Sequence, residues 1–191
     1  MKIKTTKTVT FSSKMEVVTW LAAYYGRSDT ATGLMHKNSD EDQRDKACFY
    51  LKPNSDSSAV VPGGHCAIGS ILDYAGYTQD DFAYAGCDNS QNAGAVVERL
   101  GLEIDGVTTD CSGDQLNWNF WGTLQEVHDT VALAGASDGQ LLSQIYKRNA
   151  DVLADGDFDK RNAFVKNLRL IMSGSVPTEP MDGELPNPWD E

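Results

Sequence analysis

Pro62-Gly63-Gly64-His65-Cys66-Ala67-Ile68-Gly69-Ser70-Ile71-Leu72-Asp73-Tyr74-Ala75-Gly76 is the stretch around which the rest of the chain can be arranged. Its first glycines form a flexible turn, and a short helix follows and ends at Gly76. The apolar residues of this helix recur at helical spacing on one face, and Gly69 inside it allows another backbone to come close. The pattern predicts a buried helix at the centre of a small bundle, with Cys66 in its first turn.

The segments on both sides of this stretch have mostly helical patterns. Ser13-Lys14-Met15-Glu16 is a capping box that opens a helix with Val17, Trp20, Leu21 and Tyr24 on its apolar face. A second capping box, Thr123 to Glu126, follows an aromatic segment (116–121) that we expect to pack on the core. The expected helices cover 13–25, 66–75, 78–84, 93–100, 123–134, 137–153 and 157–174. The predicted core cluster contains Trp20, Leu21, Ile68, Ile71, Leu72, Val97, Leu100 and Val127.

The two ends of the chain differ from this helical pattern. Residues 2–11 alternate like a β-strand but have no obvious strand partner, since 102–112 reads as loop or short extended chain. We therefore expect a mainly α fold with a minor strand component. Its parts would be an N-terminal strand or arm (1–12), a helical core domain (13–135), a helical pair packed on that core (136–174) and an extended, acidic, proline-rich tail (175–191).

The charge balance restricts the partners that this chain can have. The 191 residues contain 28 acidic and 16 basic side chains, which gives a net charge of −12. This charge disfavours binding to nucleic acid, because affinity for phosphate needs Lys and Arg. No long apolar run and no apolar signal segment is visible, so the expectation is a protein without a membrane span, located in the cytoplasm.

The four cysteines predict reduced thiols and no metal site. Cys48, Cys66, Cys87 and Cys111 include no C-x-x-C pair. They form no zinc motif with His36, His65 or His128. The carboxylates at 40–42, 80–81 and 155–159 lack the spacing of an EF-hand, and we expect them to be solvated faces and helix caps. We therefore predict no metal and no cofactor.

Cys66 is the main candidate for a catalytic residue. A thiolate at a helix N-terminus is stabilised by the helix dipole, and His128 and Asn119 would then be the base and the orienting amide. The competing interpretation, which we favour, is a buried structural cysteine. Separately, Asp110-Cys111-Ser112-Gly113 resembles the motif of the NlpC/P60 cell-wall peptidases. The interval from Cys111 to His128 is too short for the helix and strands of that fold.

Three features together resemble a known family: the helix from Val17 to Tyr25, the run His65 to Ile71 with Ala75-Gly76, and Asn117-Trp118-Asn119 before a capped helix. This pattern, over about residues 15–135, resembles a small uncharacterised helical domain family of actinobacteria and their phages. Ser70 and Asn119 replace the Ala and Asp that the family prefers. The resemblance implies a compact helical fold and a phage or mobile-element source, and it implies no activity.

The acidic tail contains apolar residues that a purely solvating segment would not need. Met181, Leu185 and Trp189 lie among four prolines, which favour extended chain. We predict that the tail docks on a protein partner or on a neighbouring copy through these three residues. The favoured function is a non-catalytic, phage-type accessory or virion-associated protein. The alternatives are a cysteine-dependent hydrolase or transferase centred on Cys66, and an acidic inhibitor that mimics the charge of nucleic acid.

Overall fold

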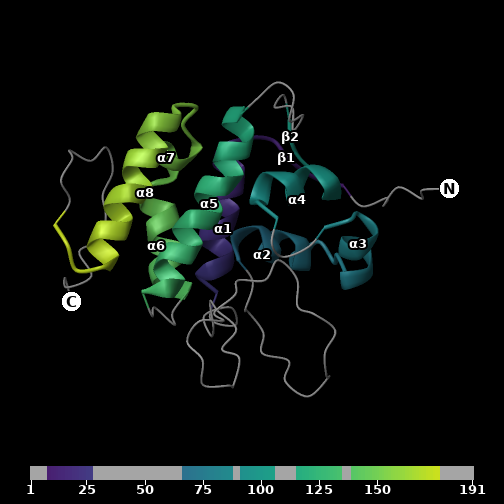
Figure 1. Cartoon of the computed structure of the whole chain (residues 1–191), viewed down its shortest axis with the longest axis horizontal. Coiled ribbons are helices and arrows are strands. Elements are labelled where there is room, and N and C mark those ends of the chain that lie inside the picture. The colour runs from purple at the N-terminus through teal and green to yellow at the C-terminus, as the bar shows by residue number, and fades with distance from the viewer. Residues whose placement is uncertain (1–7, 28–65, 88–90, 106–114, 135–138, 177–191) are drawn as a thin grey trace, which may run out of the picture.

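The computed structural model describes residues 8–27, 66–87, 91–105, 115–134 and 139–176. These residues form eight helices and one pair of short strands, so the fold is mainly α with a minor strand component, as the sequence predicts (Figure 1). The strands are β1 (Val9–Phe11) and β2 (Leu102–Ile104). The helices are α1 (Lys14–Tyr25), α2 (Ala67–Tyr74), α3 (Gln79–Tyr84), α4 (Ala93–Leu100), α5 (Gln115–Leu133), α6 (Gly139–Arg148), α7 (Ala150–Ala154) and α8 (Phe158–Met172).

Side-chain caps explain where several of these helices begin. Ser13 Oγ accepts a hydrogen bond from the backbone N–H of Glu16 at 3.1 Å and so starts α1. A complete capping box between Thr78 and Asp81 starts α3. The side chains of Asn92 and Asp157 likewise accept hydrogen bonds from the first turns of α4 and α8.

The predicted start of α5 is wrong. The sequence predicts a helix from Thr123, whereas α5 already begins at Gln115 and includes the aromatic segment. Phe120 and Trp121 are buried, and Thr123 is itself buried inside the helix instead of standing at its end. Tertiary packing of these aromatic rings stabilises two further turns before Thr123.

The prediction of a single helix over 137–153 is also wrong, because the structure has two helices there. Asn149 separates α6 from α7 with a non-helical backbone (φ −114°, ψ 22°). Its side-chain amide donates to the carbonyl of Ile145 at 2.9 Å. A polar side chain that bonds to the backbone in this way competes with regular helix geometry.

The N-terminal strand, for which the sequence showed no obvious partner, has one within the chain. β1 pairs in parallel with β2, in the register Val9 to Leu102 and Phe11 to Ile104. Phe11, Leu102 and Ile104 are buried, which fixes the pairing by packing. Residues 2–7 of the expected strand lie outside the described residues.

α5 runs through the middle of the bundle. Figure 1 shows α6, α7 and α8 on one side of it and α2, α3 and α4 on the other, and α4, α8 and α2 all pack on it. α1 packs mainly against α6 and α7. None of the described helices has both the length and the apolarity needed to cross a membrane.

Seven of the eight predicted core residues are buried in one cluster, and Trp20 is the exception. Trp20 and Tyr24 are only partly buried, while Val18, Ala22 and Tyr25 take core positions on α1. The buried face of α1 is therefore rotated about the helix axis relative to the predicted apolar face. α1 carries apolar residues around most of its circumference, so periodicity alone does not select the face that is buried.

Candidate functional site

Cys66 is the N-cap of α2 and is 1% exposed. Its sulfur accepts a hydrogen bond from the backbone N–H of Gly69, with an N to S distance of 3.4 Å. The sulfur thus takes the part that Ser, Thr or Asp oxygens usually play at a helix start. The prediction that Cys66 is buried is confirmed, and the thiol has a structural partner.

A buried chain of hydroxyl groups connects Cys66 to α1. Ser70 Oγ donates to the carbonyl of Cys66 at 3.0 Å, as serines inside helices often do to the residue one turn earlier. Ser70 Oγ also lies 2.8 Å from the Tyr25 hydroxyl. The Ser70 hydroxyl has one hydrogen and donates it to the carbonyl of Cys66, so the Tyr25 hydroxyl is the donor in this second bond. These bonds fix α2 to α1 inside the core.

His128 lies beside the same tyrosine. It is fully buried in α5, and its ring centroid is 5.8 Å from that of Tyr25. Its Nδ1 is 3.0 Å from Oδ1 of Asp129, which also accepts from Gln125. Tyr25 therefore contacts His128 through its ring and reaches Cys66 through Ser70. Asn119, the third member of the proposed set, lies in α5, but its side chain is outside the described residues.

The other predicted site residues fall outside the described part of the chain. These are Cys48, Cys111, His36 and His65, together with Met181, Leu185 and Trp189 of the tail. Cys87 is described and is a buried free thiol. Within the described ranges, no group of three or more His, Cys, Asp or Glu side chains is arranged to hold a metal ion.

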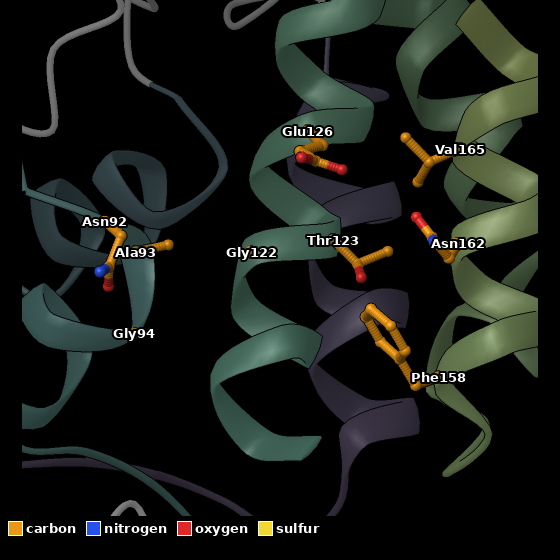
Figure 2. A pocket seen from close by; sticks show the side chains of 9 residues that line it. All are labelled: Asn92, Ala93, Gly94, Gly122, Thr123, Glu126, Phe158, Asn162 and Val165. Atoms are coloured by element: carbon orange, nitrogen blue, oxygen red, sulfur yellow. The ribbon is translucent and has the colours of Figure 1, made fainter. Parts of the chain in front are cut away.

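A groove of about 330 Å³ lies between α4, α5 and α8, away from Cys66 (Figure 2). Gly122 opens it from α5, since a Cβ built there would meet no atom within 4 Å. Phe158, at the start of α8, stands at its edge and is 38% exposed. The full lining is Asn92, Ala93, Gly94, Gly122, Thr123, Glu126, Phe158, Asn162 and Val165.

The groove lining contains polar groups but no Cys, Ser or His side chain. Glu126 supplies its one carboxylate, which forms an ion pair with Arg169 at 3.3 Å. Both side chains are half exposed, so this pair contributes little to stability. The remaining polar groups are the amides of Asn92 and Asn162 and one hydroxyl.

The turn between α7 and α8 holds Phe158 in place. Oδ1 of Asp155 accepts from the backbone N–H of Asp157 at 2.9 Å, and Oδ2 accepts from Lys160 at 3.3 Å. The hydrogen bond from the backbone N–H of Asp157 and, second to it, the hydrogen bond from the Lys160 side chain lower the pKa of Asp155 below its usual value. Arg161, which is fully buried, donates to the carbonyl of Asp155.

A cluster of aromatic side chains, here called the aromatic face, lies at the surface of α1 and α2. It consists of Trp20, Tyr24 and Tyr74. The Trp20 and Tyr24 rings stack with centroids 5.1 Å apart, and Tyr74 meets Trp20 edge to face at 5.3 Å and 66°. Tyr74 is 66% exposed, more than any other aromatic side chain whose exposure the structure describes. Sequence reasoning assigned Trp20 and Tyr24 to the core and so missed this surface.

Comparison of the chain with models of protein families, with curated proteins and with solved structures found no match. The fold and the geometry described above are therefore the basis for any statement about function.

The groove joins residues from three separate helices, and no local motif in the sequence could have revealed it.

Proposed function

We propose that this chain is a non-catalytic protein that acts through protein–protein contacts, as a phage-type accessory or virion-associated protein. The observation that carries the proposal is the aromatic face. Tyr and Trp are enriched where proteins bind one another, because they offer large, rigid contact areas. Tyr74 is two-thirds exposed and meets Trp20 edge to face, so it belongs to a cluster of aromatic rings and is not a single scattered side chain.

The environment of Cys66 supports the same conclusion. A catalytic thiol must reach its substrate, whereas this sulfur is 1% exposed and caps α2. Two contributions to the proposal come from the sequence alone. The phage-type character rests on the resemblance over 15–135, and a location in the host cytoplasm or in the virion follows from it.

The alternative of a nucleic-acid mimic has weaker support. Such a protein needs its carboxylates on one exposed face. Here Glu16, Asp81 and Asp157 act at the starts of three different helices, and Asp155 and Glu126 are paired with basic side chains. These acids are distributed around the fold by local roles.

Deletion of residues 176–191 tests the contact function. The melting temperature should stay nearly unchanged, because the described core ends at α8, while association with a partner or with neighbouring copies should weaken. Differential scanning calorimetry and sedimentation velocity give the two readouts. A deletion that leaves every association intact, or that unfolds the chain, would contradict the role of the tail.

A further inference from the structure

We infer that the aromatic face is the docking site for the proline-rich tail (177–191) of a second copy of this chain. This inference rests on the proposed contact function and specifies its surface and its ligand. The argument has three steps: the geometry of the face, the pattern of the tail and the distance that the tail spans.

The face consists of the aromatic rings on which proline-rich segments pack. The Tyr74 ring stands at 66° to the Trp20 ring, so the two aromatic planes form a corner at the surface. Tyr24, stacked on Trp20 with an interplanar angle of 19°, extends the platform along α1. Grooves lined by aromatic rings bind polyproline II helices, because proline rings pack flat on them and the extended ligand is already ordered.

The tail has the matching pattern. A polyproline II helix has three residues per turn, so residues three apart lie along the same edge. Pro177, Pro180, Pro186 and Trp189 follow this spacing, with Gly183 between them. The acidic residues Glu179, Asp182, Glu184, Asp190 and Glu191 all fall on the other two edges. In this conformation one edge of the tail carries no charge and can face a surface. Of the three residues predicted to dock, Trp189 lies on this edge, whereas Met181 and Leu185 lie on the other two.

The position of the tail favours docking between copies. It begins beyond α8, which packs on α5 and α7, whereas the aromatic face lies on α1 and α2 (Figure 1). Fifteen residues of polyproline II span about 46 Å, which is long compared with a radius of gyration of about 16 Å for a chain of this length. The tail is therefore long enough to leave its own fold and reach a neighbour. Because this contact is head to tail, repetition gives rings or filaments.

The test uses the full chain and measures self-association by sedimentation equilibrium over a range of concentrations. Tyr74→Ala should lower the association constant about tenfold or more, as the loss of a central aromatic anchor does. Its matched control is Tyr84→Ala, which removes a tyrosine on α3 that is 52% exposed and outside the aromatic face. On the tail, Pro177→Ala combined with Pro180→Ala should weaken association. Thr178→Ala, on a different edge, should not.

A synthetic peptide of residues 176–191 should dissociate the full-chain oligomer. The association should also survive an ionic strength of about 0.5 M, because the contacts are apolar and charge attraction is largely screened there. Loss of association in salt would place the tail on a charged surface, such as that around Arg169 on α8, and would overturn the inference.

Two further outcomes would also overturn it. The first is a full chain that stays monomeric at all concentrations. This outcome includes the case in which the tail docks on its own fold, which would be seen as protection of the tail from protease that depends on Tyr74. The second is an association that depends on residues 176–191 but not on Tyr74. In the second case the contact function stands and the docking surface is wrong, so the two proposals fail separately.

Discussion

Replacing Gly122 by alanine should stabilise the protein. Gly122 is inside α5, where glycine is about 1 kcal/mol less favourable than alanine. The added methyl group would enter the groove, where no atom lies within 4 Å of the new Cβ. No steric cost offsets the gain, so we expect a free energy of unfolding higher by about 0.5–1 kcal/mol. For a chain of this size that corresponds to a melting temperature higher by about 1–4 °C.

Two other glycines provide matched controls. At Gly26 a Cβ would lie 2.9 Å from Ser143 Oγ, which now donates to the carbonyl of Ala22, so Gly26→Ala should destabilise. At Gly101 the backbone is left-handed (φ 70°), and Gly101→Ala should cost about 1–2 kcal/mol. Urea denaturation followed by far-UV circular dichroism measures all three. A destabilised Gly122→Ala, with the controls behaving as stated, would mean that the groove is not open and would refute this reasoning.

Three more predictions concern the core and the α7–α8 turn. Leu72→Ala, at a fully buried position, should lower the free energy of unfolding by about 2–5 kcal/mol in urea melts, and a loss below about 1 kcal/mol would remove Leu72 from the core. Ser70→Ala should cost about 1–3 kcal/mol, because it removes the buried hydrogen bond with the Tyr25 hydroxyl. In a double-mutant cycle, Ser70→Ala together with Tyr25→Phe should cost less than the sum of the two single changes, and strictly additive losses would contradict this hydrogen bond. The lowered pKa of Asp155 stabilises the fold above the pKa of the unfolded carboxyl, and this stabilisation is lost as the pH falls through the folded value. Asp155→Asn should therefore be less stable than the parent at neutral pH and equal to it at strongly acid pH, and a difference that does not change with pH in urea melts would contradict this assignment.

The sequence predicts best what short-range interactions decide. Ser13, Thr78, Asn92 and Asp157 each cap a helix through a bond to a residue two or three positions away, so their patterns are complete within one turn. The apolar residues of α2 likewise predict that this helix is buried, although the structure buries all residues from Ala67 to Leu72 and therefore more than the predicted apolar face. These elements required no knowledge of distant partners.

The missed features depend on contacts between distant residues. β2 has three residues, too few to show a period, and its pairing with the predicted N-terminal strand joins residue 9 to residue 102. α5 begins early because Phe120 and Trp121 pack in the core. The aromatic face was missed because size and apolarity suggest burial for Trp20, whereas the core is filled by smaller residues on the adjoining side of α1.

The rate at which Cys66 reacts with a thiol reagent tests most directly whether the chain acts by contact or by catalysis. Native protein at neutral pH would be treated with iodoacetamide, and mass spectrometry would follow each cysteine separately. Because the sulfur is buried and caps α2, we predict that Cys66 reacts slowly and becomes modified only when the protein is unfolded. Fast, stoichiometric modification of Cys66 in the folded protein would contradict the contact function and favour the cysteine-dependent enzyme.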